Sequence, residues 1–156
     1  MDTESRNKAL AFVRSQQFGV LSTSDKDGQP WGAAIFFLVD DDFNFYFLTR
    51  TGTQKFGDID QNPQVALTVV DRQSQVTVQL AGTVSKVDLN EYAHDLLPKF
   101  ANLKPDDDEH WHPPVDKIHS GNYVPLKITP TRLQYADYGQ KTEDITADHI
   151  VKIIGG

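Results

Sequence analysis

One segment of the chain links a predicted strand to a predicted helix: Phe45-Tyr46-Phe47-Leu48-Thr49-Arg50-Thr51-Gly52-Thr53-Gln54-Lys55. Its aromatic half favours a strand, and its polar half collects hydroxyls, a glycine, a guanidinium and an ammonium. Arginine offers a planar fork of donors, lysine a point charge, and the free amides of a first helical turn point at the same place. This combination is typical of a phosphate-monoester site. It also fits an ordinary helix N-cap at Thr51 or Thr53 beside solvated basic residues.

Short strands and helices are predicted on either side of this segment. The patterns indicate about six strands in antiparallel hairpin order, with Asp27-Gly28 and Asp40-Asp41-Asp42 in two of the turns. Short strands at this spacing are typical of a β-barrel or a sandwich. The expected helices lie at 4–17, 53–61 and 90–100, and the expected strands at 18–23, 31–39, 43–49, 65–70, 75–87, 123–129 and 131–138, the last two interrupted by Pro130.

The 156 residues are expected to form one domain, because neither a repeat nor a linker is evident. Gly82 lies inside a predicted strand and indicates a bulge or a close approach of backbone. The tail from 139 to 156 is harder to assign. It could add an edge strand or dock as a final segment through Ile150, Val151, Ile153 and Ile154.

The composition excludes several classes of function. The chain has no cysteine, so disulfides, thiolate metal sites and thiol catalysis are excluded. Its net charge of −7 disfavours binding to nucleic acid, although a few local donors can still bind one small anion. The polar N-terminus and the lack of a long apolar run predict neither a secretory signal nor a membrane span, so we expect a cytoplasmic protein.

The ordered set of motifs resembles the pyridoxamine 5'-phosphate oxidase-like, FMN-binding split barrels over residues 5–138. Thr53-Gln54-Lys55 is similar to the family's phosphate-binding Ser/Thr-x-Lys element. The resemblance implies a mainly β protein, a six-stranded antiparallel split barrel with peripheral helices that forms a homodimer with FMN at the interface. The other matching motifs are Gly19-Val20-Leu21-Ser22-Thr23, Asp27-Gly28-Gln29-Pro30, Phe36-Phe37-Leu38, Asn62-Pro63-Gln64-Val65-Ala66-Leu67, 77–84 and 127–135.

The resemblance also implies which residues contact the flavin. Arg50, Thr53 and Lys55 would hold the phosphate, while backbone groups near Phe36, Phe37 and Thr49 would face the isoalloxazine ring. From the partner subunit, Thr77 or Gln79 would approach the polar edge of the ring and Trp111 would cover it. The expected cofactor contacts are Phe36, Phe37, Thr49, Arg50, Thr51, Thr53, Gln54, Lys55, Thr77, Gln79 and Trp111.

Three departures from the family pattern argue against oxidation of pyridoxamine phosphate itself. The true oxidase has an arginine early in the strand after its Gly-x-Pro turn, and that position falls at or near Ala33 here, so one phosphate donor is missing. Thr77 replaces a family glutamine. No counterpart of the oxidase's Arg- and His-containing substrate motif lies between Pro125 and Gly156.

The residues are compatible with functions of different kinds. The first is an FMN-dependent oxidoreductase acting on an unidentified small molecule, with reduced nicotinamide as a candidate hydride donor and no catalytic side chain required. The second is a non-catalytic carrier that binds flavin, another cofactor such as a deazaflavin or haem, or none. The third rests on charge alone: an interaction domain whose acidic 106–109 loop meets a basic partner.

None of the five histidines is predicted to bind a metal ion or to act as a catalytic group. His110 and His112 alternate as metal ligands can, but no third clear ligand accompanies them, so a solvated acidic loop is the better interpretation. His94, His119 and His149 are expected at the surface or with satisfied hydrogen bonds.

Overall fold

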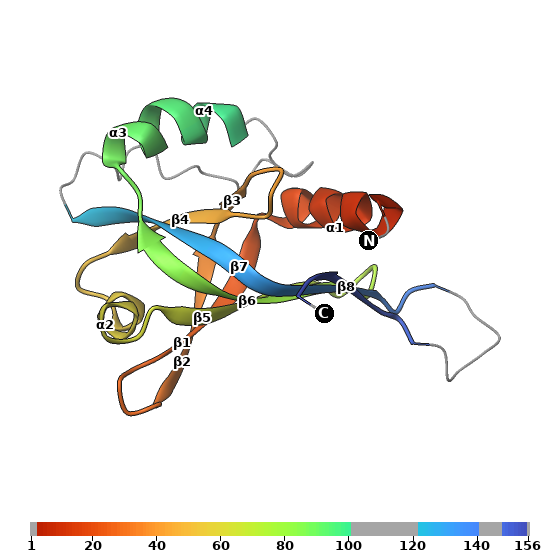
Figure 1. Cartoon of the computed structure of the whole chain (residues 1–156), viewed down its shortest axis with the longest axis horizontal. Coiled ribbons are helices and arrows are strands. Elements are labelled where there is room, and N and C mark those ends of the chain that lie inside the picture. Colours follow the sequence, from red (N-terminus) through yellow and green to blue (C-terminus); the bar gives the residue numbers. More distant parts are fainter. Residues whose placement is uncertain (1–2, 101–121, 141–147, 156) are drawn as a thin grey trace.

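A single antiparallel sheet organises the computed structural model, which describes residues 3–100, 122–140 and 148–155. Its strands follow the order β2-β1-β5-β6-β7-β4-β3, and β8 pairs with β7 outside this path. The strands are β1 Phe18–Ser24, β2 Pro30–Phe36, β3 Leu38–Val39, β4 Phe45–Arg50, β5 Gln64–Asp71, β6 Val76–Lys86, β7 Tyr123–Asp137 and β8 Ile150–Ile154. The helices are α1 Thr3–Gln16, α2 Gln54–Gln61, α3 Leu89–Glu91, the π-helix η1 Tyr92–Leu96 and α4 Leu97–Phe100 (Figure 1).

The sheet curls into a split barrel because its two edge strands are consecutive in the chain. β2 forms one edge, β3 forms the other, and Phe37 alone connects them. The two edges therefore meet at this residue, while β2 and β4 remain unpaired with each other. Phe37 is fully buried, its N–H donates to the Gln17 carbonyl at 2.9 Å, and its ring packs edge-on against Phe45 at a centroid distance of 5.1 Å. The predicted fold class, a mainly β split barrel with peripheral helices, is confirmed.

The described chain has eight strands where the sequence indicated about six. The apolar run 31–39 divides at Phe37, where the chain passes from one sheet edge to the other. Residues 150–154 add an edge strand to β7, one of the two arrangements that the sequence left open.

The two late strands predicted around Pro130 form one continuous strand, β7. Pro130 lies opposite Gly82, at a register shift between β6 and β7. Proline has no N–H to give to the sheet, and a bulge is a position where this loss is tolerated. The prediction of a bulge or close approach at Gly82 is confirmed.

Helix α1 packs across the barrel and is tied to the turn between β3 and β4. Its residues Ala9 and Val13 are fully buried in the main core. An Arg14 Nη2 donates to the Asp41 carboxylate at 2.6 Å, and Arg6 donates to the backbone carbonyl of Asp41 at 2.7 Å. The acidic segment 40–42 is a turn, as predicted.

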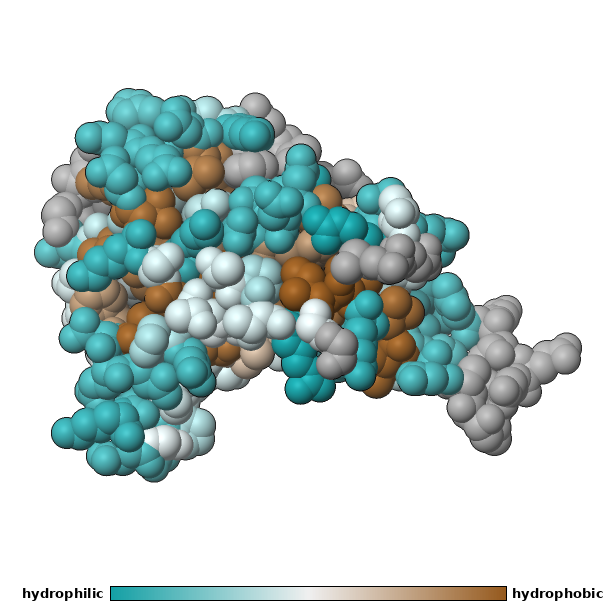
Figure 2. All heavy atoms as spheres, viewed as in Figure 1, coloured by the Kyte–Doolittle hydropathy of each residue, from teal (hydrophilic) through white to brown (hydrophobic). Residues whose placement is uncertain are grey.

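The segment formed by α3, η1 and α4 covers β3 and β4 on the face opposite the main core. A second hydrophobic cluster joins it to the sheet through the buried residues Leu38, Tyr46, Tyr92 and Leu97. Figure 2 shows hydrophilic residues over the outward side of these helices and hydrophobic residues beneath them. The half-buried side chains of Phe36 and Leu48 also pack against this cluster, which therefore borders the opening of the barrel.

Gly82→Ala is expected to lower the free energy of unfolding by about 1–3 kcal/mol. The added Cβ would meet the Thr129 carbonyl oxygen at 2.6 Å and the Ile128 side chain at 2.8 Å. Gly57→Ala in α2 is the matched control, because nothing lies within 4 Å of its Cβ and alanine stabilises a helix by ~0.5–1 kcal/mol. Urea unfolding of both variants measures the difference, and a Gly82→Ala midpoint equal to that of the wild type would contradict this account.

Candidate functional site

A cavity of about 240 Å³, which we call the seam cavity, lies at the split between β2 and β4 beside the start of α2. The two strands are not hydrogen-bonded to each other there, so the barrel is open along this seam. Aliphatic and aromatic side chains form part of its wall, and hydroxyls and cations form the rest. The lining residues are Ala34, Ile35, Phe36, Leu48, Thr49, Arg50, Thr53, Lys55 and Tyr123.

Hydroxyl groups fix the start of α2 at this cavity. Thr53 is the N-cap: its Oγ1 accepts from the Phe56 N–H at 3.4 Å and donates to the Arg50 carbonyl at 2.8 Å. The Thr49 hydroxyl lies 3.2 Å from that of Thr53. The first backbone bond of the helix runs from the Gly57 N–H to the Thr53 carbonyl. The N–H groups of Gln54 and Lys55 come before this bond and therefore have no partner within the helix. The cap that the sequence left as an alternative is therefore present, at Thr53, and it orders a helix N-terminus beside the cavity.

Arg50 and Lys55 supply two positive charges to the seam cavity. Burial of Lys55, and next the nearby charge of Arg50, lower the pKa of its amino group. Within the described parts of the chain, neither cation forms an ion pair with a carboxylate. An anion between them would relieve both the repulsion and the loss of hydration. A phosphate monoester, with a charge of about −1.5 to −2 at neutral pH, matches this requirement.

Of the cofactor contacts expected between residues 36 and 55, some line the seam cavity and others do not. Phe37 is buried in the main core, and Thr51 is exposed with its N–H donating to the Asn122 carbonyl at 3.1 Å. The Gln54 side chain donates to the Asp58 carboxylate at 2.9 Å and does not line the cavity. The residues that do line it are Phe36, Thr49, Arg50, Thr53 and Lys55.

Thr77 and Gln79 lie on β6, on the outer face of the sheet. They alternate with the buried residues Val76 and Val78, and Gln79 accepts a hydrogen bond from Gln134 at 2.7 Å. Neither residue lines the seam cavity of its own chain. Contact of either with a flavin in this cavity would require a second subunit. Trp111 lies outside the described residues.

Tyr123 and Leu48 line the cavity although the sequence did not single them out. Tyr123 pairs with Arg50 where β7 lies beside β4. No local pattern reports this pairing, because the two strands are far apart in the chain. Leu48 did have a signal, since a strand residue two positions before Arg50 shares its face.

The residues that the structure describes contain no group of three or more histidine and acidic side chains arranged to hold a metal ion. None of their helices combines the length and the apolar composition required to span a membrane. The candidate pair His110 and His112 lies outside the described residues, so the prediction of no metal site there stays a prediction.

The family model described as pyridoxamine 5'-phosphate oxidase matches residues 5–137. The chain belongs to this family. The expected resemblance is thereby confirmed for the greater part of this oxidase-family chain. No curated protein has a sequence that matches it.

Solved structures from several organisms share the fold of this oxidase-family chain. General Stress Protein 26 from Bacillus anthracis str. Sterne is 23% identical, with a TM-score of 0.63, and the match covers 83% of this chain and 92% of that chain. A heme binding protein from Mycobacterium smegmatis is 14% identical, with a TM-score of 0.71 and coverage of 99% and 60%. An FMN binding protein related to pyridoxamine 5'-phosphate oxidase, from Nostoc punctiforme PCC 73102, is 14% identical, with a TM-score of 0.61 and coverage of 90% and 87%. At these identities the likeness establishes the fold.

Proposed function

We propose that this protein binds FMN, with the phosphate held by Arg50, Thr53 and Lys55 and the ring extending along the seam between β2 and β4. The observation that carries this proposal is the pair of cations at the start of α2, in a cavity where no described carboxylate pairs with them. Membership of the oxidase family and the fold shared with the FMN binding protein from Nostoc punctiforme support it. The proposed activity is a flavin-dependent oxidation or reduction of a small molecule in the cytoplasm, with reduced nicotinamide as the candidate donor.

The seam cavity suits one end of an FMN molecule better than the whole of it. A volume of about 240 Å³ falls below the ~300–1,000 Å³ of pockets that enclose a small ligand. Ala33 is half-buried and brings no third cation to the phosphate. One chain thus offers a phosphate site and part of a ring site, and a second subunit is proposed to complete the rest.

The outer face of the sheet offers a surface for that second subunit. Three large apolar side chains, here called the outer apolar patch, are about half exposed: Phe18 at 53%, Val20 at 48% and Val70 at 57%. The Phe18 ring packs against Phe36 of the cavity wall at a centroid distance of 5.5 Å. A copy seated on this patch would therefore adjoin the seam cavity, which supports a homodimer with shared flavin sites.

When bound, the flavin ring would supply the hydride or electron chemistry. The side chains of this protein bind and orient it. Arg50 and Lys55 would fix the phosphate, while Phe36 and Leu48 keep an apolar surface along the seam. The described lining of the cavity contains no histidine and no carboxylate, and its side chains that can transfer a proton are Lys55 and Tyr123.

A cofactor carrier is the alternative, and haem is its best-supported cargo other than flavin. The fold is shared with a heme binding protein from Mycobacterium smegmatis. Haem iron takes a His, Cys, Met or Tyr ligand, and of these residue types the described lining of the seam cavity offers only Tyr123. The cation pair and the scarcity of iron ligands favour FMN in this cavity.

The purified protein is expected to show the visible absorption of flavin, and Lys55→Ala should weaken FMN binding by about 10- to 100-fold. A hydrogen bond to a charged group contributes ~1.5–3 kcal/mol, which corresponds to this loss. Riboflavin lacks the phosphate and should bind the wild type and the variant with similar Kd values. Quenching of flavin fluorescence measures both constants.

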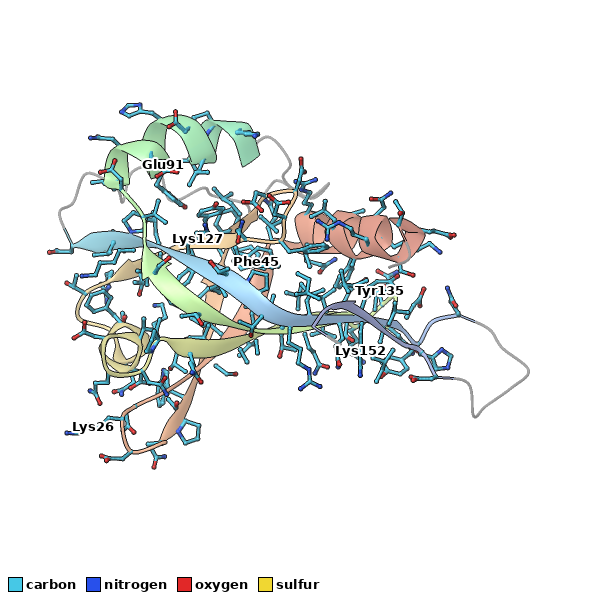
Figure 3. The ribbon with its side chains drawn as sticks, in the orientation of Figure 1. Lys26, Phe45, Glu91, Lys127, Tyr135 and Lys152 are labelled. Carbon is cyan, nitrogen blue, oxygen red and sulfur yellow. The ribbon has the colours of Figure 1, made fainter. Side chains whose placement is uncertain are left out.

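Lys26→Ala is the matched control for this variant. Lys26 is exposed at the tip of the β1–β2 hairpin, where Figure 3 shows its side chain directed away from the barrel. The control removes the same charge far from the cavity, so its FMN affinity should equal that of the wild type. An equal loss in both variants, or an equal loss for FMN and riboflavin in Lys55→Ala, would contradict the phosphate assignment.

The wild type is expected to have a solution mass of about twice its 17.5 kDa chain mass. Val20→Asp places a charge in the outer apolar patch and should yield single chains with weaker FMN binding, because the cavity loses its proposed cover. Leu89→Asp changes an exposed apolar residue on α3 and should leave the mass unchanged. Light scattering measures the mass, and a single-chain mass for the wild type would refute the dimer.

An oxidoreductase should exchange electrons at a useful rate, unlike a carrier. Reduced nicotinamide is expected to bleach the bound flavin under anaerobic conditions, and an added small-molecule acceptor should restore the colour. Absorbance in a stopped-flow instrument follows both steps. Bleaching by dithionite but not by reduced nicotinamide would rule out nicotinamide as the donor, and the lack of any acceptor would favour the carrier.

A further inference from the structure

Asp58 is a buried carboxylate outside the seam cavity. Its side chain is 1% exposed, its Oδ2 accepts from the Thr23 hydroxyl at 2.8 Å, and its Oδ1 accepts from the Gln54 amide at 2.9 Å. No cation forms an ion pair with it in the described part of the chain. A buried carboxylate without a cation is unfavourable unless its oxygens accept hydrogen bonds, so these two bonds account for its presence.

Helix α2 is held at its start by the Thr53 cap, which bonds the Arg50 carbonyl at the end of β4. It contains eight residues, too few for stability on its own, and its buried residues are Asp58 and Ile59. Side chains of Gln61 and Asn62 bond the β1–β2 hairpin, but they lie at the end of the helix. Figure 1 shows α2 at the same end of the barrel as this hairpin. The Thr53 cap thus holds the start of α2 to β4, and the bonds that join Gln54, Asp58 and Thr23 hold its first turn to β1.

We propose that Asp58 is a positioning residue for the anion site: it holds the first turn of α2 against β1 and thereby sets the location of Lys55. This inference rests on the proposed function, because it concerns the group that would meet the FMN phosphate. Gln54 immediately precedes Lys55 and lies one helical turn before Asp58, so tilting of that turn would move the ammonium away from the cavity. A donor displaced by about an ångström loses most of a hydrogen bond.

The charge of Asp58 by itself would oppose anion binding, since a carboxylate repels a phosphate. Its value to the site therefore lies in its two acceptor oxygens. Asp58→Asn can keep both bonds without the charge, because the amide oxygen can accept from Gln54 and the amide N–H can donate to the Thr23 hydroxyl. Asp58→Ala loses both bonds, and Thr23→Val loses one with little change of shape.

The first test compares the Kd values of FMN and riboflavin in these three variants. Asp58→Ala and Thr23→Val should weaken FMN binding roughly tenfold relative to riboflavin, while Asp58→Asn stays close to the wild type. A merely structural role would weaken both flavins equally. An unchanged ratio of the two constants in Asp58→Ala would overturn the positioning role while leaving the FMN proposal intact.

The second test needs no cofactor and so remains decisive if the wild type binds no FMN. It follows the Lys55 amino group by NMR during a pH titration. Burial lowers the pKa of Lys55, and release of the first turn in Asp58→Ala should raise it towards the ordinary lysine value. Loss of the negative charge of Asp58 by itself would lower the pKa of Lys55, and the Asp58→Asn variant measures that effect separately.

A higher Lys55 pKa in Asp58→Ala but not in Asp58→Asn supports the inference, and an unchanged or lower value in Asp58→Ala refutes it. Thr23→Val supplies the same comparison if Asp58→Ala fails to fold. Circular dichroism identifies that case.

Discussion

The link made by Phe37 between the two edges of one sheet is the constraint on which the rest of the structure depends. One residue is too short to let the edges separate, so the sheet must curl until β2 and β3 meet. It cannot close further, because β4 pairs with β3 and β7 and leaves β2 unpaired. Burial of the Phe37 ring against Phe45 stabilises the junction. The seam is therefore a consequence of topology.

The seam also explains why the cation pair is tolerated. Arg50 ends β4, Lys55 lies in the first turn of α2, and both line a cavity that is open to solvent on one side. Partial hydration limits the repulsion between them, whereas full enclosure would drive the ammonium to lose its proton. A binding site for an anion and an incompletely closed barrel are thus two aspects of one arrangement.

Local sequence predicted well the features that depend on neighbouring residues. The strand, cap and helix around Thr53 follow from hydroxyl capping and from alternation in a strand, and Gly82 marked a bulge because no Cβ fits beside the Thr129 carbonyl. The division of the run 31–39 at Phe37 was not predictable in this way. Apolar residues continue without interruption through Phe37, and the division appears only in the pairing, because Phe36 pairs with β1 and Leu38 pairs with β4.

The sequence alone determined the kind of site: a guanidinium, a hydroxyl cap and an ammonium within one strand-to-helix connection, set in a chain with the motifs of the oxidase family. The tertiary structure decided which members of that segment share a cavity. It turned Gln54 towards Asp58, placed Phe37 in the core and brought Tyr123 beside Arg50. The physical reason is that residue type and spacing are local properties, whereas the direction of a side chain depends on strand pairing and helix packing between distant parts of the chain.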